Sequence, residues 1–596
     1  MIENEPSKTF LLLPPIPTPN GRLHLGHIAG PFLRLDAAAR YLRSRGHKAY
    51  LVSGTDPYES YVIHHAEKEA TEPDKLARRY TLQIQNDLAA FCIDYDIWLD
   101  PLICPGRGIY ERNCEQLLQR LMGSDAAHYK TRSFPYSPND EQFIPRSYLA
   151  GFCPRCKADI VGCLCEECGL QFTAQEVIEP YFRPAHFRPA KQSAEQVLAW
   201  QNADVVEVTL DEKDEKLQHV AADMQALHIP SHQIETIMDH VYQQKCRVEL
   251  TVPGTWGVEW QGINQGIGEH STITPQIVYT YGAIYLYYLT AGEVFAQSAG
   301  GVLVNDGEKS KNAFAVDSDV VTISSYGADT AVPWIAMPNI LSHVDVDENG
   351  QRQYTDCDYY WGNEFLCLHG SKFSTSRRHV IWASGLIEQT PVDADMARFY
   401  LATIDPTDEQ TDFVIDGLVD TINQRVIDEV YRAVNVCLQQ YQSHDLQAPS
   451  ASMSDLISKV FAEQDGCFEA SQYYLTKAAD VIVNWVETWQ ALGDKSPQDK
   501  KQSDSYWFLK SLAMISYPVM PNFAESLWQH LGAVGIPNMA QFDSKTVIRA
   551  ASFKCRTSHI SQADIYPCMP ETLSHLINHP SPQSRESATI EETNHV

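Results

Sequence analysis

Two short segments of the sequence combine residue types that can hold phosphate. The first is His24-Leu25-Gly26-His27, which lies between the proline-rich end of an apolar run, residues 9–13, and the start of a helical pattern. A helix N-terminus offers unpaired N–H groups and a positive dipole. Gly26 lets a nucleotide approach the backbone, and the imidazoles can donate hydrogen bonds to phosphate oxygens. Taken alone, the tetrapeptide is more simply a pair of surface or capping histidines.

The second segment lies in an expected loop and reads Lys372-Phe373-Ser374-Thr375-Ser376, followed by Arg377 and Arg378. A lysine, several hydroxyl groups and guanidinium groups close together can enclose a polyanion. Taken alone, this segment is more simply a solvated basic loop.

A third group of residues has the spacing of a metal site. The chain has 15 cysteines, and two Cys-x-x-Cys pairs, Cys153 with Cys156 and Cys165 with Cys168, lie close together. Four thiolates at this spacing can close a tetrahedral site for structural Zn²⁺. Free thiols or disulfides are the alternative, and Cys163 is expected to be a bystander.

The elements that position these residues are expected to alternate strands and helices. Residues 9–13 read as a buried strand, a helical pattern runs from about Gly26 to Arg45, and residues 48–53 read as the next strand. This β-turn-α-β order is typical of the opening of a nucleotide-binding fold. Residues 74–122 and 191–245 read as mostly helical, residues 300–375 as a second α/β half, and helical stripes fill 416–442, 453–492 and 504–532.

Composition excludes several classes of protein. The 596 residues carry a formal net charge of −30, which excludes a polybasic nucleic-acid coat but not a local basic patch. The hydrophobic fraction of 44% is that of a globular chain. No apolar run is long enough for a membrane span, and no signal peptide is recognisable. We therefore expect a cytoplasmic protein without membrane association.

In this order and spacing, the two polar segments resemble the two signature sequences of class I aminoacyl-tRNA synthetases. The resemblance is to methionyl-tRNA synthetases and covers most of residues 9–535. Residues 14–27 match the first motif of that family, and Gly54-Thr55-Asp56 matches its second-strand segment. Residues 91–96, Phe-Cys-Ile-Asp-Tyr-Asp, and residues 515–521, Ile-Ser-Tyr-Pro-Val-Met-Pro, match two further stretches. The family also carries a zinc knuckle in a connective insertion.

The resemblance implies an α/β fold in which a Rossmann-like nucleotide fold is split by a zinc-binding connective insertion and followed by an all-α anticodon-binding-like domain. The expected parts are a first catalytic half at 1–125, the insertion at 126–245, and a second catalytic half with the Lys372 loop at 246–395. The helical domain follows at 396–570, and a disordered tail at 571–596.

The resemblance also implies an aminoacyl-tRNA ligase that forms AMP and diphosphate from ATP with Mg²⁺. The residues expected to be catalytic are His24, His27 and Lys372. Those expected to bind ATP are Gly26, Gly327, Asp329, Lys372, Ser374, Thr375, Ser376 and Arg377. Those expected to bind the amino acid are Ile16, Thr18, Asp56, Tyr279, Gly282, Ala283 and Trp334. The expected zinc ligands are Cys153, Cys156, Cys165 and Cys168.

Several positions depart from the family pattern. Thr375 replaces the second lysine of the Lys-Met-Ser-Lys-Ser signature, and Arg377 or Arg378 is a candidate to supply the missing charge. Thr18 stands where an aromatic residue is usual, and Trp334 stands where a histidine is usual. Because a methionine pocket packs apolar and aromatic walls around a thioether, these changes leave two options open, retained methionine or another amino acid.

The residues expected to read an anticodon are also ambiguous. Asn423 and Arg425 lie on one expected helix, and Asn484, Trp485 and Trp489 lie on the next. Tryptophan stacking on an unpaired base is a common device for reading RNA. Packing of both tryptophans in a helical core is an equally good interpretation.

Three hypotheses for function therefore remain open. The first is a ligase that charges tRNA with methionine, and the second is a paralogue that activates another amino acid, with or without tRNA. The third is a binding protein that keeps only the fold, against which the retained His24, His27 and Lys372 argue. A monomer is the default expectation.

Overall fold

The computed structural model describes most of the chain. The described residues are 6–165, 167–168, 170–183, 198–210, 215–227, 229–243, 247–260, 262, 275–280, 284–298, 312–373, 378–440, 447–492, 501–544 and 553–573. The expected site residues Gly282, Ala283, Ser374, Thr375, Ser376 and Arg377 lie outside them, as does the expected tail beyond residue 573. No helix in the described part of the chain is both long enough and apolar enough to cross a bilayer.

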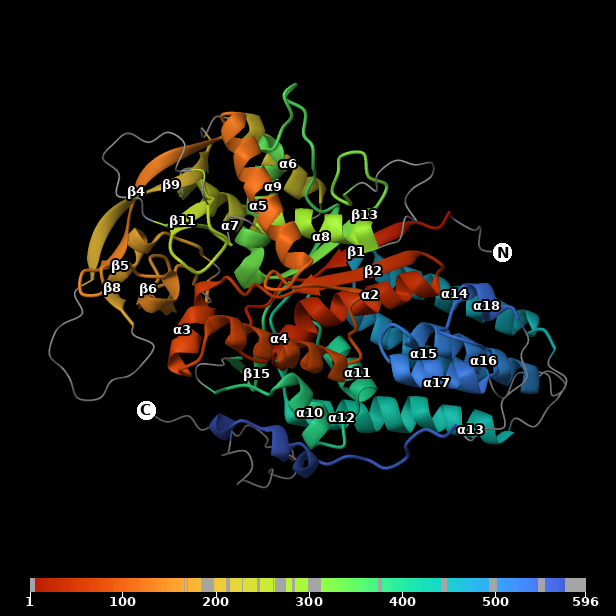
Figure 1. The fold of residues 1–596 in the computed structure, drawn as a ribbon. Coiled ribbons are helices and arrows are strands. Elements are labelled where there is room, and N and C mark those ends of the chain that lie inside the picture. Colours follow the sequence, from red (N-terminus) through yellow and green to blue (C-terminus); the bar gives the residue numbers. More distant parts are fainter. Residues whose placement is uncertain are drawn as a thin grey trace, which may run out of the picture.

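A five-stranded parallel sheet forms the centre of the molecule (Figure 1). Its strand order is β14-β13-β1-β2-β3. The strands are β1 (Thr9–Leu13), β2 (Lys48–Gly54), β3 (Ile97–Leu99), β13 (Val321–Gly327) and β14 (Tyr359–Asn363). Leu12 of the middle strand lies opposite Leu51 and Ile323 and is fully buried. Burial on both faces explains the uninterrupted apolar run at residues 9–13, and the strand predicted there is confirmed.

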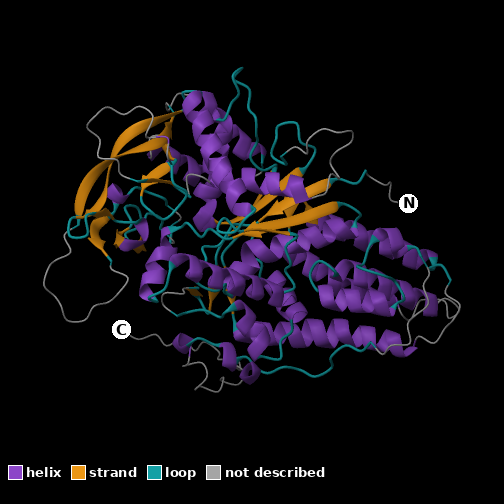
Figure 2. Cartoon of the chain, in the orientation of Figure 1, coloured by secondary structure: helices purple, strands orange, loops and turns teal. Residues whose placement is uncertain are grey.

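Helices cover this sheet on both faces (Figure 2). They are α1 (Leu25–His27), α2 (Leu33–Ser44), α3 (Ser60–Lys68), α4 (Pro73–Ala90), α5 (Gly106–Gly123), α8 (Ile284–Ser298) and α9 (Met337–Val344). A π-helical turn, η1 (Ile28–Phe32), joins α1 to α2 where one continuous helix is predicted. The reason is local, because Pro31 removes an N–H and Gly30 leaves helical geometry.

The region between the two halves of the sheet is richer in strands than the sequence predicts. A four-stranded antiparallel sheet contains β4 (Ala127–Ser137), β5 (Gln142–Phe143), β9 (Ala199–Thr209) and β10 (Arg247–Glu249). The prediction of mostly helical structure at 191–245 is therefore wrong for β9, although α6 (Glu215–Ala226) and α7 (Ser231–Gln243) are helices. The prediction of helical structure at 74–122 is also wrong for β3, which lies within that range. Strand β9 depends on pairing with β4, a partner about 70 residues away that local periodicity does not reveal.

The smaller strand elements complete this part of the fold. They are β6 (Leu149–Phe152), β7 (Asp159–Val161), β8 (Ile178–Phe182), β11 (Thr251–Pro253), β12 (Gln276–Val278), β15 (Leu366–Leu368), β16 (Ser371–Lys372) and β17 (Thr411–Phe413). β6, β7 and β8 form a separate three-stranded sheet around the cysteine-rich segment.

The C-terminal third of the chain is a bundle of helices (Figure 2). Its members are α10 (Ala383–Gln389), α11 (Ala394–Thr403), α12 (Ile415–Thr421), η7 (Ile422–Tyr431), α13 (Arg432–Gln440), α14 (Ala451–Cys467), α15 (Leu475–Leu492), α16 (Lys501–Ser516), α17 (Pro521–His530) and α18 (Met539–Phe542). The predicted α/β fold followed by a helical region is thus confirmed.

A fully buried arginine joins the bundle to the sheet. Arg398 of α11 lies 2.7 Å from a carboxylate oxygen of Asp36 on α2. Its guanidinium also donates to the carbonyls of Phe91, Pro518 and Val519 at 2.8–2.9 Å. Burial alone would raise the pKa of Asp36, but Arg40 and Arg398 together hold it below its ordinary value. Each of the three nitrogens of this guanidinium therefore has a partner outside α11.

We predict that Arg398→Met destabilises the protein by about 3 kcal/mol or more, because it removes one of the two arginines paired with the buried Asp36 and leaves several buried carbonyls without their donor. The matched control is Arg432→Met, which removes an ion pair whose arginine side chain is 67% exposed. That change is expected to cost less than about 0.5 kcal/mol. Urea unfolding measures both free energies, and equal losses would contradict the role given to Arg398.

Candidate active site and metal centre

The two polar segments, some 350 residues apart in sequence, contact each other at the end of β1. The His24 ring stacks on Phe373 with centroids 5.1 Å apart, and on His27 at 3.8 Å. Backbone bonds join the flanking residues, from Leu25 N–H to the Ile381 carbonyl and from Ala383 N–H to the Leu23 carbonyl. The two segments therefore form one local structure at the carboxyl edge of the parallel sheet, where ligands bind in such folds.

Both histidines are neutral at neutral pH. Burial lowers the pKa of His27 to about 4. Burial, with charge repulsion from His27 next, lowers the pKa of His24 well below its usual value. The backbone N–H of His24 donates to Nδ1 of His27, so the His27 proton lies on Nε2. Neutral imidazoles of this kind are hydrogen-bond donors rather than fixed positive charges.

Close packing explains the glycine of the first segment. A Cβ built on Gly26 would lie 3.1 Å from His24 Nδ1 and 3.4 Å from Phe373. A larger residue would therefore push the rings apart.

Lys372 is held at the entrance to the loop whose next residues lie outside the described part of the chain. It ends β16, which pairs with β15, and its ammonium lies 3.7 Å from the centre of the Phe365 ring. This cation–π contact orients the charge. Arg378, at the other end of the loop, has a left-handed φ of +54°.

Two further residues with predicted roles lie at the same edge of the sheet. Gly327 ends β13 opposite Asn363 at the end of β14, and Asp329 follows in a short turn. A Cβ on Gly30 would lie only 2.8 Å from the Asn363 amide nitrogen. The sequence prediction missed Asn363, because its place is fixed by strand pairing and no local motif marks it.

Asp56 follows β2 and lies buried on the other side of β1. Burial, reinforced by the neighbouring Glu59 carboxylate, raises the pKa of Asp56 to about 7. Glu59 is itself buried, and burial raises its pKa too. The prediction also missed Glu59, although it stands only three residues after Asp56.

A small cavity of about 30 Å³ lies against Asp56. Besides Asp56, Ile16 is the predicted amino-acid-binding residue that lines this cavity. Thr280 and Tyr287, which were not predicted, also line it. Trp334 does not line it but packs behind, edge-on to the Tyr287 ring at 5.6 Å. Thr18 lies in the loop after β1 and lines neither this cavity nor the larger one below.

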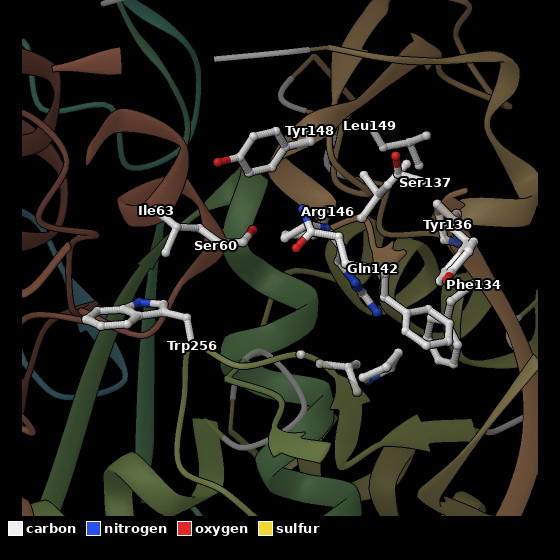
Figure 3. A pocket seen from close by; sticks show the side chains of 18 of the residues that line it. Ser60, Ile63, Phe134, Tyr136, Ser137, Gln142, Arg146, Tyr148, Leu149 and Trp256 are labelled. Atoms are coloured by element: carbon white, nitrogen blue, oxygen red, sulfur yellow. The ribbon is translucent and has the colours of Figure 1, made fainter. Parts of the chain in front are cut away.

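A much larger cavity of about 1980 Å³ meets the small one at Thr280. Figure 3 shows Trp256 on one side, Phe134 and Tyr136 on the other, and Arg146 between them. The Arg146 guanidinium pairs with Glu249 and lies 4.0 Å from the centre of the Tyr279 ring. Tyr279 thus lines the large cavity, next to the small one. The prediction missed Arg146, which only long-range packing brings here.

The four cysteines predicted to bind metal converge. Their sulfur atoms all lie within 4.8 Å of one another, with Cys153 and Cys168 at 3.8 Å and Cys156 and Cys165 at 3.5 Å. A tetrahedral zinc with Zn–S bonds of about 2.3 Å requires sulfur separations of about 3.8 Å, so the residues fit Zn²⁺. Cys163 is buried outside this group, and burial raises its pKa to about 11.

The candidate RNA-reading residues are engaged inside the bundle. Trp485 and Trp489 are only 3% and 7% exposed, and Trp489 stacks on Phe508 at 4.8 Å. The side-chain amide of Asn423 both donates to and accepts from the backbone of Ile560. Both tryptophans therefore pack in the core of the bundle. Arg425 pairs with Asp480, and Asn484 is exposed.

Comparison with known proteins adds independent information. The family model described as "tRNA synthetases class I (M)" matches residues 10–438. A methionine–tRNA ligase of Thermoplasma volcanium is 25% identical over 545 residues, covering 87% of this chain and 91% of that protein. One from Methanobrevibacter smithii is 22% identical over 539 residues, covering 86% of this chain and 74% of that protein.

A solved structure shares the fold. Methionyl-tRNA synthetase of Mycobacterium tuberculosis bound by methionyl-adenylate has a TM-score of 0.64 at 14% identity, covering 91% of this chain and 99% of that one.

We predict that the purified protein holds about one zinc per chain, as a four-thiolate site requires. Cys165→Ser is expected to lose the metal and lower the melting temperature, because a structural zinc contributes folding energy. Cys163→Ser is the control and should keep full zinc. Elemental analysis measures both, and zinc loss from the control would contradict the assigned ligand set.

Proposed function

Because the chain belongs to the class I tRNA synthetases of the methionine group, whose model covers most of its length, we propose that it joins an amino acid to tRNA through an aminoacyl-adenylate. The observation that supports the proposal is the contact between the His24 segment and the Lys372 segment. The buried Asp56 follows the neighbouring strand β2, so the groups proposed for phosphate and for the ammonium follow adjacent strands.

In the proposed first step the carboxylate of the amino acid attacks the α-phosphorus of ATP and pyrophosphate leaves. Nε2–H of His27 donates to phosphate oxygen, and His24 lies stacked beside it. Lys372 approaches from the opposite segment with its charge. Donors fixed before the reaction stabilise the developing charge without reorganisation. Mg²⁺, when bound with ATP, would neutralise part of the phosphate charge.

Neutral histidines suit this role better than charged ones. A buried imidazolium would be costly in free energy before ATP arrives, whereas a neutral N–H is available at any pH above about 4, the pKa of His27. Gly26, Gly327 and Asp329 lie at the same edge of the sheet and are proposed to border the nucleotide.

Asp56 is proposed to hold the substrate ammonium, with Ile16 and Tyr287 beside the side chain. Methionine is the substrate that the relatives' names indicate. The cavity at Asp56 has the volume of about one water molecule, so a side chain of methionine's size requires the lining residues to move.

A second candidate follows from the same cavity. Its wall includes the threonines Thr55, Thr280 and Thr290, and Trp334 packs behind Tyr287 instead of lining it. The small volume of this cavity favours a smaller side chain than methionine. The second proposal is therefore a ligase that activates a different amino acid.

The acceptor is proposed to enter through the large cavity (Figure 3). This cavity reaches Thr280 and Tyr279 from the side of β4 and β5, and the residues proposed to bind phosphate do not line it. Its aromatic residues Phe134, Tyr136 and Trp256 offer faces on which unpaired bases stack.

Exchange of labelled pyrophosphate into ATP, measured with each of the twenty amino acids, tests the function. Exchange with methionine followed by charging of total tRNA supports the first proposal, and exchange with another amino acid supports the second. His27→Ala is expected to lower the exchange rate by about 10²-fold or more. A protein that exchanges with none of the amino acids would refute both proposals.

The affinity for the amino acid is predicted to depend on pH through Asp56. Only the ionised carboxylate attracts an ammonium, and the pKa of Asp56 is about 7. The KM for the amino acid should therefore fall about tenfold between about pH 6 and pH 8, while the KM for ATP stays level.

Glu59→Gln provides the matched control for this pH dependence. Removing the neighbouring negative charge makes ionisation of Asp56 easier, so the inflection should move to lower pH. An inflection that stays in place would exclude the coupling of these two carboxylates.

A further inference from the structure

The cysteine-rich segment at residues 146–182, here called the metal knuckle, is hydrogen-bonded directly to the first turn of α3. This turn follows shortly after Asp56 in the chain. Tyr61 Oη donates to the Val161 carbonyl at 2.7 Å. Ser147 donates twice to Ser60, from its hydroxyl to the Ser60 carbonyl at 2.8 Å and from its N–H to the Ser60 hydroxyl at 3.2 Å. Three hydrogen bonds thus fasten two consecutive residues of α3 to β7 and to the short helical turn, residues 146–148, that leads into β6.

The contact at Tyr61 is closely fitted as well as bonded. Gly162 has a left-handed φ of +83°, and a Cβ there would lie 2.8 Å from Tyr61 Oη. The phenol therefore occupies the space that a side chain at this position would need. The knuckle thus requires glycine at this position for two reasons, conformation and close approach.

On the knuckle side, the bonded segment leads straight into the cysteine cluster. Val161 ends β7, and the Gly162 N–H donates to the Leu149 carbonyl of β6 at 2.8 Å. Cys165 follows three residues after Gly162 and is one of the four convergent cysteines. The position of the Val161 carbonyl thus depends on the same turn that the metal would close.

On the substrate side, the same helical turn is tied to Asp56. Asp56 Oδ1 accepts from the Tyr58 N–H at 3.2 Å. Glu59 caps α3, accepting from the Tyr61 N–H at 2.8 Å. Trp256 donates to the Pro57 carbonyl at 2.8 Å. Residues 56–61 therefore form one turn in which successive hydrogen bonds connect the Asp56 carboxylate to Tyr61.

We propose that Tyr61 is a positioning residue that transmits the rigidity of the metal-stabilised knuckle to Asp56, and so sets the affinity for the amino acid. The inference rests on the proposed function, because it takes Asp56 as the partner of the substrate ammonium. A carboxylate must be held within about 0.5 Å to bind an ammonium well. The bond from Tyr61 to Val161 is the shortest of the three that hold this turn.

The test is Tyr61→Phe, which keeps the ring and removes only the hydroxyl. In pyrophosphate exchange, the KM for the activated amino acid should rise about three- to tenfold, as loss of one hydrogen bond implies. The KM for ATP should stay within about twofold, and zinc content should be unchanged. Ser147→Ala, which removes a second of the three bonds, should act in the same direction.

The matched control is Tyr80→Phe. Tyr80 lies on the neighbouring helix α4, and its hydroxyl donates to Glu69 at 3.0 Å in an exposed position. It should change neither KM. Equal increases in both KM values for Tyr61→Phe, or loss of zinc with no change in KM, would overturn the proposal.

Amide hydrogen exchange provides a readout that does not need activity. Stripping zinc from the wild-type protein with a chelator should speed exchange at residues 58–61, whose N–H groups bond to Asp56 and Glu59. In Tyr61→Phe these amides should exchange faster before chelation and respond little to it. If chelation leaves residues 58–61 unchanged in the wild type, the coupling does not exist. Absence of pyrophosphate exchange with any amino acid would instead refute the proposed function, and amide exchange would still decide the coupling.

Discussion

The parallel pairing of β1 with β2 on one side and β13 on the other is the constraint on which the rest of the structure depends. β1 and β13 are separated by about 300 residues of chain, yet Leu12 lies directly opposite Ile323. Because all strands run the same way, their carboxyl ends meet at one edge. That edge receives the His24 turn, the end of β2 with Asp56, and the end of β13 with Gly327. The chain therefore leaves β3 at this edge and must cross to the opposite edge of the sheet before β13 begins.

The parts of this architecture that the sequence predicts are those set by neighbours in the chain. An apolar run of five residues becomes β1 because both of its faces are buried. The two Cys-x-x-Cys pairs meet because β7, which lies between them in the chain, pairs back onto β6. The first signature segment is recognisable because its glycine and histidines stand at fixed steps after a strand, and the second because a lysine and several hydroxyl side chains stand together.

The parts that escape prediction are set by partners far away in sequence. β9 is polar at its start and becomes a strand only by pairing with β4. Asn363 reaches the site because β14 pairs with β13. Arg146 faces Tyr279 because the knuckle folds back over α3. In each case the local residues are compatible with several structures, and tertiary contacts select one.

Burial also changes the protonation states that the sequence alone suggests for the titratable residues of the site. His24 and His27 look like a basic pair, yet burial keeps both neutral. Asp56 looks like a permanent anion, yet burial and Glu59 raise its pKa to about 7. Among the described residues, burial thus lowers the charge that these three groups carry, while the Lys372 ammonium lies against the Phe365 ring. Under the proposed function, the charges of ATP and of the substrate ammonium would meet groups that are already in place.

With a net charge of −30, RNA recognition depends on which side chains are locally available at the surface. Trp485 and Trp489, the aromatic residues best suited to stack on bases, are packed against Phe508 inside the bundle. Arg425 is neutralised by Asp480. Under the proposed function, these two tryptophans are buried away from an RNA acceptor, and the large cavity beside the candidate site offers aromatic faces on Phe134, Tyr136 and Trp256 instead. Recognition through the end of the acceptor rather than through the bundle is the arrangement that this distribution of side chains favours.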